Sequence, residues 1–197
     1  KYEYSEYALF NDLGSSPATI EAAKAVDAFG CVPGHVTEIS DAPQAYTQTE
    51  LGNIVRGRET ETWVRLPKGQ RPAHFEKIID PVVPLTLALY GRPDAGGYWE
   101  QKCDKDVNYA GFETVENWPS TYFNKELNVI LMVYVDDFNM AGAPAKVKEA
   151  WTRLTKPGRL KLDPPEPQGK SLGCVHSTFD NTVNGKKVRG VKYDMSD

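Results

Sequence analysis

The feature that most constrains this chain is an apolar run, residues 129–133 (VILMV), followed closely by two adjacent carboxylates, Asp136 and Asp137. A β-branched run of this kind is typical of a buried strand, and an apolar alternation resumes over residues 138–142. The pattern predicts a β-hairpin with two acidic side chains at its tip. Two neighbouring carboxylates are costly unless cations neutralise them, and Mg²⁺ takes oxygen ligands. The alternative interpretation is an ordinary polar turn, because Asp prefers turns.

Composition and charge limit what else the chain can be. Its 197 residues are enough to bury a sizeable core, and its hydrophobic and charged fractions are ordinary for a globular domain. The 27 acidic residues outnumber the 23 basic ones, which does not favour a nucleic-acid binder. Three widely spaced cysteines argue against a disulfide framework and fit a reducing compartment. The sequence has no apolar stretch that could span a bilayer and no recognisable signal segment.

The first half of the chain predicts a helix followed by short elements. Ser16 is placed as the N-cap of a helix over residues 18–29, and Gly30 as its stop. Residues 36–39 indicate a short strand that runs into Asp41. Further expected elements are a strand over 61–66, a buried run over 85–90 and a helix over 98–104.

The second half contains the clearest helix, which opens at Pro144. Its apolar face repeats at steps of three and four residues, at Val147, Ala150, Trp151 and Leu154. Residues 164–167 (PPEP) predict a stiff extended connection. Asn184 and Gly185 stand between two alternating segments, which is a strong signal for a two-residue β-hairpin.

A second acidic position lies at the end of the strand expected over residues 36–39. Asp41 is followed five positions later by the aromatic Tyr46. A lone Asp before a proline is usually a turn former. In combination with Asp136 and Asp137, however, it supplies the carboxylates needed to clamp two divalent ions, about 3.5–4 Å apart, for phosphoryl transfer.

These motifs resemble a known family. Two segments look like catalytic motifs of reverse transcriptases: Asp41 with Tyr46, and the later segment 134–137 (YVDD). The sequence between them resembles copia-type LTR retrotransposon polyproteins. The supporting segments, in order, are 16–19 (SPAT), 63–69 (WVRLPKG), 88–91 (ALYG) with 98–99 (YW), 111–112 (GF), 120–123 (STYF) and 172–174 (LGC). The ordered resemblance covers residues 16 to about 176.

The resemblance implies an α+β fold, a reverse-transcriptase-like palm in which helices back an antiparallel sheet, with an extra C-terminal β-hairpin. It implies a palm with partial fingers over 1–160, and the palm end with the hairpin over 161–197, leading toward a missing thumb. The chain would be a fragment of an RNA-directed DNA polymerase. Its partners would be an RNA/DNA primer–template and deoxynucleoside triphosphates. Its location would be intracellular, cytoplasmic or particle-associated.

The resemblance also implies individual roles. Asp41 and Asp136 would bind two catalytic Mg²⁺ ions, and Asp137 would support the site with its charge. The carbonyl of Ala42 would be a further metal ligand. Tyr46 would be the sugar gate that favours deoxynucleotides, although a half-buried strand aromatic is its simpler interpretation. Such catalysis works by positioning and electrostatics.

One position departs from the family pattern. Asp94 stands where the family has a Gln that contacts the incoming nucleotide, and a carboxylate there repels a triphosphate. Arg92 could compensate by pairing with Asp94 or with phosphate; a surface arginine is the simpler interpretation. With a fingers segment expected before Lys1 and a thumb after Asp197, the isolated chain is expected to have little polymerase activity.

The alternative function is a catalytically inactive relic of the palm fold, or a structural subunit recruited into a larger assembly whose other subunits cover the fingers and thumb surfaces.

The best candidate cluster for binding nucleic acid is basic and consists of Lys186, Lys187 and Arg189. It would lie near the primer or simply aid solubility. Three tryptophans are candidate stacking platforms for bases, although helical spacing assigns the last to the core: Trp99, Trp118 and Trp151.

Two weaker constellations remain. Cys31 with His35, and Cys174 with His176, could form a zinc site, but their spacing is not that of a standard finger and buried thiols are the commoner interpretation. Lys170 could donate a proton to pyrophosphate; a solvated lysine on a turn is the simpler interpretation.

Overall fold

The computed structural model describes residues 15–51, 62–171 and 173–195. It is built around a six-stranded antiparallel sheet with the strand order β4-β5-β6-β7-β1-β8. The strands are β4 (Glu113–Thr114), β5 (Thr121–Asn124), β6 (Val129–Tyr134), β7 (Asp137–Gly142), β1 (Val36–Asp41) and β8 (Glu166–Pro167). The helices of the described part are α2 (Ile20–Gly30), α3 (Ala95–Tyr109) and α4 (Pro144–Leu154). The predicted α+β class with an antiparallel sheet is therefore confirmed.

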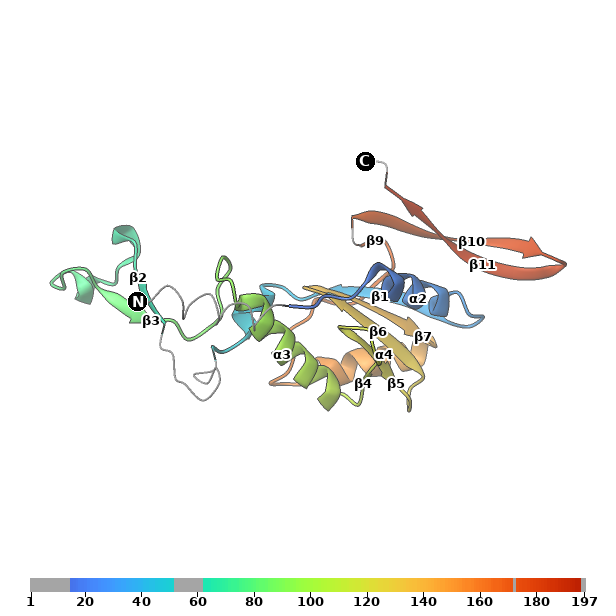
Figure 1. Ribbon diagram of the computed structural model, residues 1–197, viewed down its shortest axis with the longest axis horizontal. Coiled ribbons are helices and arrows are strands. Elements are labelled where there is room, and N and C mark those ends of the chain that lie inside the picture. The colour runs from blue at the N-terminus through green and yellow to red at the C-terminus, as the bar shows by residue number, and fades with distance from the viewer. Residues whose placement is uncertain (1–14, 52–61, 172, 196–197) are drawn as a thin grey trace.

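Helices cover both faces of this sheet, and the alternation of strand β6 explains why. Leu131 and Val133 belong to the larger core cluster, which also contains α3 and α4 residues such as Trp99 and Trp151. Met132 points to the opposite face and joins a smaller cluster with α2. Figure 1 shows α2 above the sheet, and α3 and α4 below it. A run that is apolar at every position is what a strand covered on both faces requires.

Helix α2 begins later than the sequence predicts. Thr19, not Ser16, is the N-cap, and its side chain accepts a hydrogen bond of 3.2 Å from the amide of Ala22. Ala18 lies before the helix, and its amide donates to the carbonyl of Val133 of strand β6 at 3.2 Å. The predicted stop is confirmed, because Gly30 is the last helical residue.

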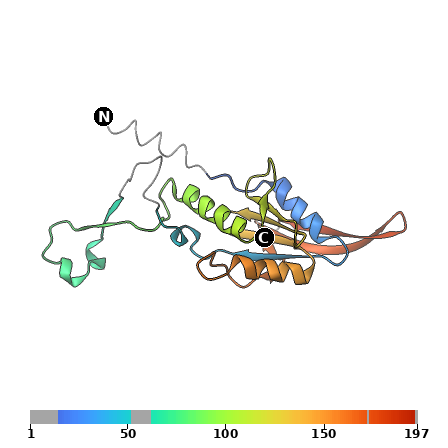
Figure 2. The ribbon, with the colours of Figure 1, turned by 90° about the horizontal axis from the view of Figure 1, so that it is seen from below.

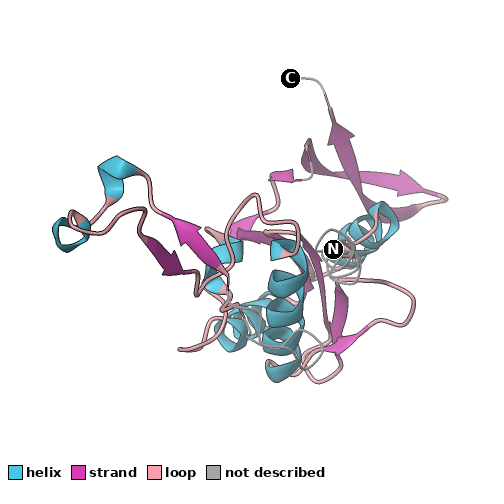
Figure 3. Ribbon diagram, turned by 60° about the vertical axis from the view of Figure 1, so that its left-hand side comes forward, coloured by secondary structure: helices cyan, strands magenta, loops and turns pink. Residues whose placement is uncertain are grey.

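The predicted buried run over residues 85–90 is wrong. Of these residues only Ala88 is buried, while Leu87, Leu89 and Tyr90 are between 41% and 52% exposed. The reason is that the segment lies outside the six-stranded sheet, in an excursion whose own sheet has two strands, β2 (Trp63–Arg65) and β3 (Val82–Pro84). Figures 2 and 3 show this excursion projecting from the body. The strand predicted over 61–66 is β2; Glu61 lies outside the described residues.

Short 3₁₀ turns complete the chain between β1 and α3. They are η1 (Ala45–Gln48), η2 (Lys68–Gln70) and η3 (Ala73–Phe75). The helix predicted over 98–104 is longer than expected. It starts at Ala95 in spite of Gly96 and Gly97, with the amide of Tyr98 bonded to the carbonyl of Asp94 at 3.2 Å.

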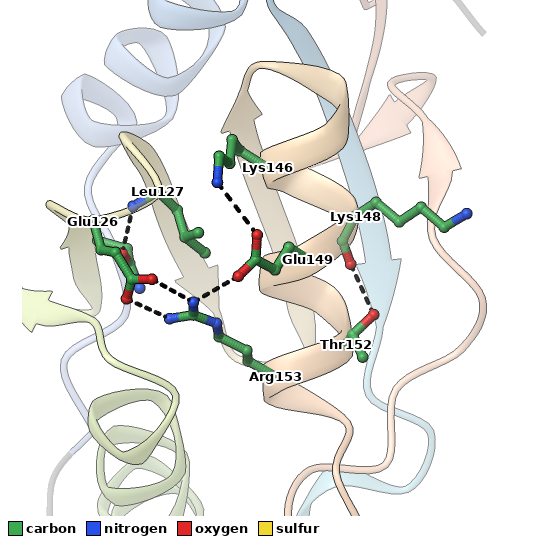
Figure 4. A network of polar contacts seen from close by, with 8 residues as sticks. Glu126, Leu127, Lys146, Lys148, Glu149, Thr152 and Arg153 are labelled. Atoms are coloured by element: carbon green, nitrogen blue, oxygen red, sulfur yellow. Dashed lines mark hydrogen bonds and ion pairs between the residues drawn. The ribbon is translucent and has the colours of Figure 1, made fainter.

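Helix α4 is the clearest helix of the sequence, and its predicted apolar face is buried. Its outer face is tied to the β5–β6 turn by charge. Figure 4 shows Arg153 between Glu126 and Glu149, with guanidinium–carboxylate distances of 2.6 to 2.8 Å. The fork geometry of Arg suits such paired contacts, which join the end of α4 to the β5–β6 turn at the surface.

The C-terminal part forms a separate sheet of β9 (Lys170–Ser171), β10 (Cys174–Val183) and β11 (Lys186–Asp194). The hairpin predicted at Asn184 and Gly185 is confirmed, and both residues have the positive φ, 51° and 76°, that a type I′ turn needs. Leu172, part of the LGC segment, lies outside the described residues. In the part of the chain that the structure describes, no helix is long and apolar enough to cross a bilayer.

A buried polar cluster attaches this hairpin to α2. Asp27 accepts hydrogen bonds from Tyr193, at 2.8 Å, and from Gln168, and His176 lies 3.2 Å from the same carboxylate. Gln168 and His176 are themselves 2.8 Å apart. Beyond this cluster the hairpin projects from the body, as Figure 1 shows, and most of its side chains are exposed.

Candidate metal centre

Strand pairing brings the two acidic motifs together. Strands β1 and β7 are antiparallel neighbours, and Asp41 at the end of β1 is the register partner of Asp137 at the start of β7. Directly opposed residues of an antiparallel pair project from the same face, with Cα atoms about 4.5–5.5 Å apart. Ile39 and Asn139 form the next pair on that face. The juxtaposition that the sequence suggested is therefore built by backbone register.

Asp136 occupies the tip of the hairpin between β6 and β7. Tyr134 pairs with Asp137, so the connection consists only of Val135 and Asp136. Val135 has a φ of 58°, whereas Asp136 keeps a negative φ, and this is the pattern of a type II′ turn. A β-branched residue with positive φ is a steric outlier, so the turn stores strain beside the acidic residues.

Two donors from other elements hold the turn. The indole Nε1 of Trp99, a residue of α3 that is 2% exposed, donates to the carbonyl of Val135 at 2.5 Å. The amide of Ala42 donates to the carbonyl of Asp136 at 2.9 Å. The turn is thus anchored both to the helix layer and to the end of β1.

The carboxylates act on one another electrostatically. Partial burial, followed by the charges of Asp136 and Asp163, raises the pKa of Asp41 above its ordinary value. Burial, followed by the charges of Asp136 and Asp41, raises the pKa of Asp137. Both shifts mean that these groups resist ionisation where no cation is present.

The same face contains acidic residues that sequence reasoning missed. An open cavity of about 340 Å³ is lined by Asp41 and Asp137 together with Asp163, Glu166 and Lys170. The amide of Asp163 donates to the carbonyl of Asp41 at 2.9 Å. The carbonyl of Asp163 accepts a bond of 2.7 Å from Ser40, 123 positions earlier. No local motif links segments so far apart, so only the fold places Asp163 here.

The donor chemistry of this face fits a hard divalent cation. Carboxylate oxygens are what Mg²⁺ prefers, and Asp41, Asp136 and Asp137 supply them from two neighbouring strands and their turn. Within the described residues, no group of three or more His, Cys, Asp or Glu side chains is already arranged around a single metal position. The three aspartates thus fit the cation by ligand type. Their carboxylates are not yet gathered around one metal position.

Tyr46 lies beside the acidic residues. It belongs to η1, directly after β1, is half-buried and packs against Tyr90 with ring centroids 4.6 Å apart. Burial raises the pKa of the Tyr46 hydroxyl, with further contributions from the charges of Asp136 and Tyr90. The side chain is therefore within electrostatic reach of the hairpin tip.

Arg92 and Asp94 pair with each other. Both guanidinium edge nitrogens of Arg92 contact the carboxylate of Asp94, one of them at 2.7 Å, and a third donates to Thr62 at 2.6 Å. The side chain of Asp94 is fully buried and that of Arg92 is 18% exposed. Of the two partners considered for Arg92, the structure shows the carboxylate of Asp94. Asp94 is at the N-cap position of α3, but its side chain pairs with Arg92 and makes no capping hydrogen bond.

The basic cluster lies on the C-terminal hairpin. Lys186, Lys187 and Arg189 belong to β11, and Arg189 is 3.3 Å from Asp180 of β10. Lys187 and Arg189 line an open cavity of about 470 Å³ with residues that follow α2, such as Val32. Strand alternation places Lys186 on the other face of the hairpin.

The two histidines considered for zinc have other partners. The ring of His35 bonds the carbonyl of Phe29 at 3.0 Å, and His176 belongs to the Asp27 cluster. Cys31 and Cys174 are free, half-buried thiols.

Among the tryptophans, Trp99 and Trp151 are buried, as predicted for Trp151, and Trp118 is only partly buried. Burial leaves the first two no face for stacking on bases.

Comparison with protein-family models, with curated proteins and with solved structures gives no match to this chain in any of the three.

Proposed function

We propose that this chain is the palm of an RNA-directed DNA polymerase of the copia type, which adds nucleotides to a primer 3′-hydroxyl with two Mg²⁺ ions. The observation that carries the proposal is the register of Asp41 opposite Asp137, with Asp136 at the adjoining turn. Carboxylates from a strand end and from a neighbouring hairpin are what two-metal phosphoryl transfer needs. The ordered sequence resemblance supports the same conclusion.

The roles follow from position. Asp41 and Asp136 would hold the cations, with the carbonyl of Ala42 as a further ligand. Asp137 would keep negative charge at the edge of the site. When bound, the metal ions supply charge neutralisation for the triphosphate and make the attacking hydroxyl easier to deprotonate. The protein itself contributes orientation, because β1, β7 and the turn are joined by backbone hydrogen bonds.

Tyr46 would select the sugar. Its ring packs on Tyr90 and its hydroxyl is within the field of Asp136. A nucleotide whose triphosphate is held at Asp41 and Asp136 would place its sugar against this ring. Asp94, buried and neutralised by Arg92, would present little net charge to that nucleotide.

Primer extension tests the proposal. The purified chain is incubated with an RNA template, a labelled DNA primer, Mg²⁺ and deoxynucleotides, beside Asp136→Asn. Asp180→Asn is the matched control, since Asp180 is an exposed carboxylate on the distant hairpin. Extension by the isolated chain is expected to be weak, to require Mg²⁺, to be lost in Asp136→Asn and to persist in the control. Extension that survives Asp136→Asn, or the absence of both extension and any Mg²⁺-dependent rise in Tm, contradicts the proposal.

A second function, a structural subunit of a larger assembly, is favoured by exposed apolar side chains. On the hairpin Val175, Phe179, Val183 and Val188 are between 41% and 50% exposed. Apolar patches of this kind mark interaction surfaces. Sedimentation of the chain beside Phe179→Ser tests this function. The subunit is favoured over the enzyme by two results together. The chain self-associates and Phe179→Ser abolishes the association, and no primer extension depends on Asp136.

A further inference from the structure

The turn that presents Asp136 has a close alternative conformation. Types II′ and I′ share a positive φ at the first central residue and differ at the second, where only I′ has a positive φ. Rotation of the peptide between Val135 and Asp136 interconverts them, and it carries the carbonyl of Val135 to the opposite side of the turn. The observed turn is II′, with a φ of 58° at Val135 and a negative φ at Asp136.

Local sterics favour the alternative. The first central position of a II′ turn is normally Gly, because L residues with a Cβ are crowded there. Val is β-branched and is more crowded than most. Asp, in contrast, tolerates positive φ better than most residues, so the I′ turn is accessible to this Val-Asp pair. Something outside the turn must therefore hold the observed form.

We infer that Trp99 is the positioning residue that holds the hairpin tip in the II′ form and thereby sets the backbone from which the Asp136 side chain projects, an inference that rests on the proposed function. The indole Nε1 of Trp99 donates to the carbonyl of Val135 at 2.5 Å, and this is the carbonyl that the rotation displaces. The ring itself is 2% exposed and fixed in the core of α3 and the sheet.

The energetic direction follows from burial. In the I′ form the carbonyl of Val135 points away, and the buried indole N–H loses its acceptor, which is costly for a donor without water. The bond from Ala42 to the carbonyl of Asp136 concerns the next peptide, so it does not replace this restraint. The rotation leaves the Cα of Asp136 nearly in place but turns over its amide, and so it changes the rotamers open to a carboxylate whose charge acts on Asp41.

The test uses the whole chain and a pair of substitutions. Trp99→Phe keeps an aromatic ring and removes only the donor. Combining it with Val135→Gly supplies the residue that II′ turns prefer, so the donor becomes dispensable. Two quantities are measured: the nuclear Overhauser contact between the amide protons of positions 135 and 136, which are close in I′ and distant in II′, and the affinity for Mn²⁺ alone.

The expected result is that Trp99→Phe produces the amide contact and weakens Mn²⁺ binding by about tenfold, the effect of losing one buried hydrogen bond. The double variant should lose the contact and recover wild-type affinity. A Trp99→Phe protein with the wild-type amide pattern would overturn the inference, as would a double variant that recovers nothing. If the wild-type chain binds no Mn²⁺, the proposed function fails, and the amide contact alone decides the inference.

A measurement on the unaltered chain covers the case in which Trp99→Phe does not fold. A scalar coupling through the hydrogen bond, between the indole nitrogen of Trp99 and the carbonyl carbon of Val135, reports the bond directly. Detection of this coupling in the wild type, and retention of the II′ amide pattern, support the restraint. A missing coupling in otherwise well-resolved spectra overturns it.

Discussion

The amide of Ala42 donates a hydrogen bond of 2.9 Å to the carbonyl of Asp136. This bond joins the residue that follows Asp41 to the residue that precedes Asp137, just beyond the register pair that those two aspartates form. The three carboxylates are therefore placed by continuous backbone pairing rather than by flexible side chains. A site of this construction keeps its acidic residues together even though, without cations, their charges repel one another.

The first prediction concerns the cost of that repulsion. Replacing Asp137 with Asn should stabilise the cation-free protein at pH 7, because burial and the charges of Asp136 and Asp41 raise the pKa of Asp137. The expected rise in Tm is at most about 2–4 °C, the response of a domain of this size to 1 kcal/mol, since solvent screens a half-exposed group. Thermal unfolding followed by circular dichroism measures it.

The sign of the pH dependence follows from the same shift. A raised folded-state pKa means that the contribution of Asp137 to stability is fully present below its ordinary value of 3.8 and is lost as pH rises through the folded pKa. The advantage of Asp137→Asn should therefore shrink as pH falls toward about 4. Asp180→Asn, at an exposed site, is the control and should show little such trend. An advantage that grows on acidification contradicts the assignment.

A second prediction concerns the pair of Arg92 and Asp94. Replacing Arg92 with Met removes the partner of a fully buried carboxylate, and breaking a buried pair in this way costs about 3–5 kcal/mol. The additional substitution Asp94→Asn should restore much of that loss, because no buried charge remains. Urea unfolding measures the free energies. Equal stability of wild type and Arg92→Met would show that the pair is not closed in solution.

A third prediction concerns the attachment of the C-terminal hairpin. Asp27→Ala leaves Tyr193, Gln168 and His176 without their common acceptor, at an expected cost of about 2–3 kcal/mol. Hydrogen exchange should accelerate first in β10 and β11, while β6 and β7 keep their protection. Asp180→Ala removes a carboxylate from the same hairpin without touching the cluster, and it should leave the exchange pattern unchanged. Uniform acceleration over the whole chain would contradict a local attachment.

A fourth prediction concerns sugar selection. The ring of Tyr46 packs on Tyr90, and the charge of Asp136 acts on its hydroxyl. A smaller side chain at this position should therefore admit a 2′-hydroxyl. Tyr46→Val should reduce the preference for deoxynucleotides over ribonucleotides by about ten- to a hundredfold, which is the range that pocket shape achieves. Tyr46→Phe keeps the ring and is the control. Single-nucleotide incorporation measures both; equal selectivity of Tyr46→Val and wild type contradicts the role.

Sequence patterns predicted the elements whose signal is local. The VILMV run, the α4 periodicity and the Asn184-Gly185 turn each depend on neighbouring residues, and each element is present. The acidic juxtaposition was also inferred, because two motifs at strand ends suggested it. The exposed segment 85–90 was wrongly predicted as buried, since an apolar run does not reveal whether a sheet covers it.

The supports of the site were beyond sequence reasoning for a physical reason. The contact of Asp163 with Asp41 and the bond from Trp99 to Val135 join segments that are far apart in the chain, and no periodicity encodes such pairs. The positive φ of Val135 was equally hidden, because the residue type argues against it. Disagreement between local preference and the fold is expected at functional or strained positions, and Val135 is a strained one.

The central claim, that Asp41, Asp136 and Asp137 form a divalent-cation site, is tested most directly by Mn²⁺ titration followed by electron paramagnetic resonance. Mn²⁺ accepts the same carboxylate ligands as Mg²⁺. The account predicts saturable binding by the wild type, unchanged in Asp180→Asn and weakened about tenfold or more in Asp136→Asn, a loss of at least about 1.4 kcal/mol. No binding by the wild type, or equal binding by wild type and Asp136→Asn, would contradict it.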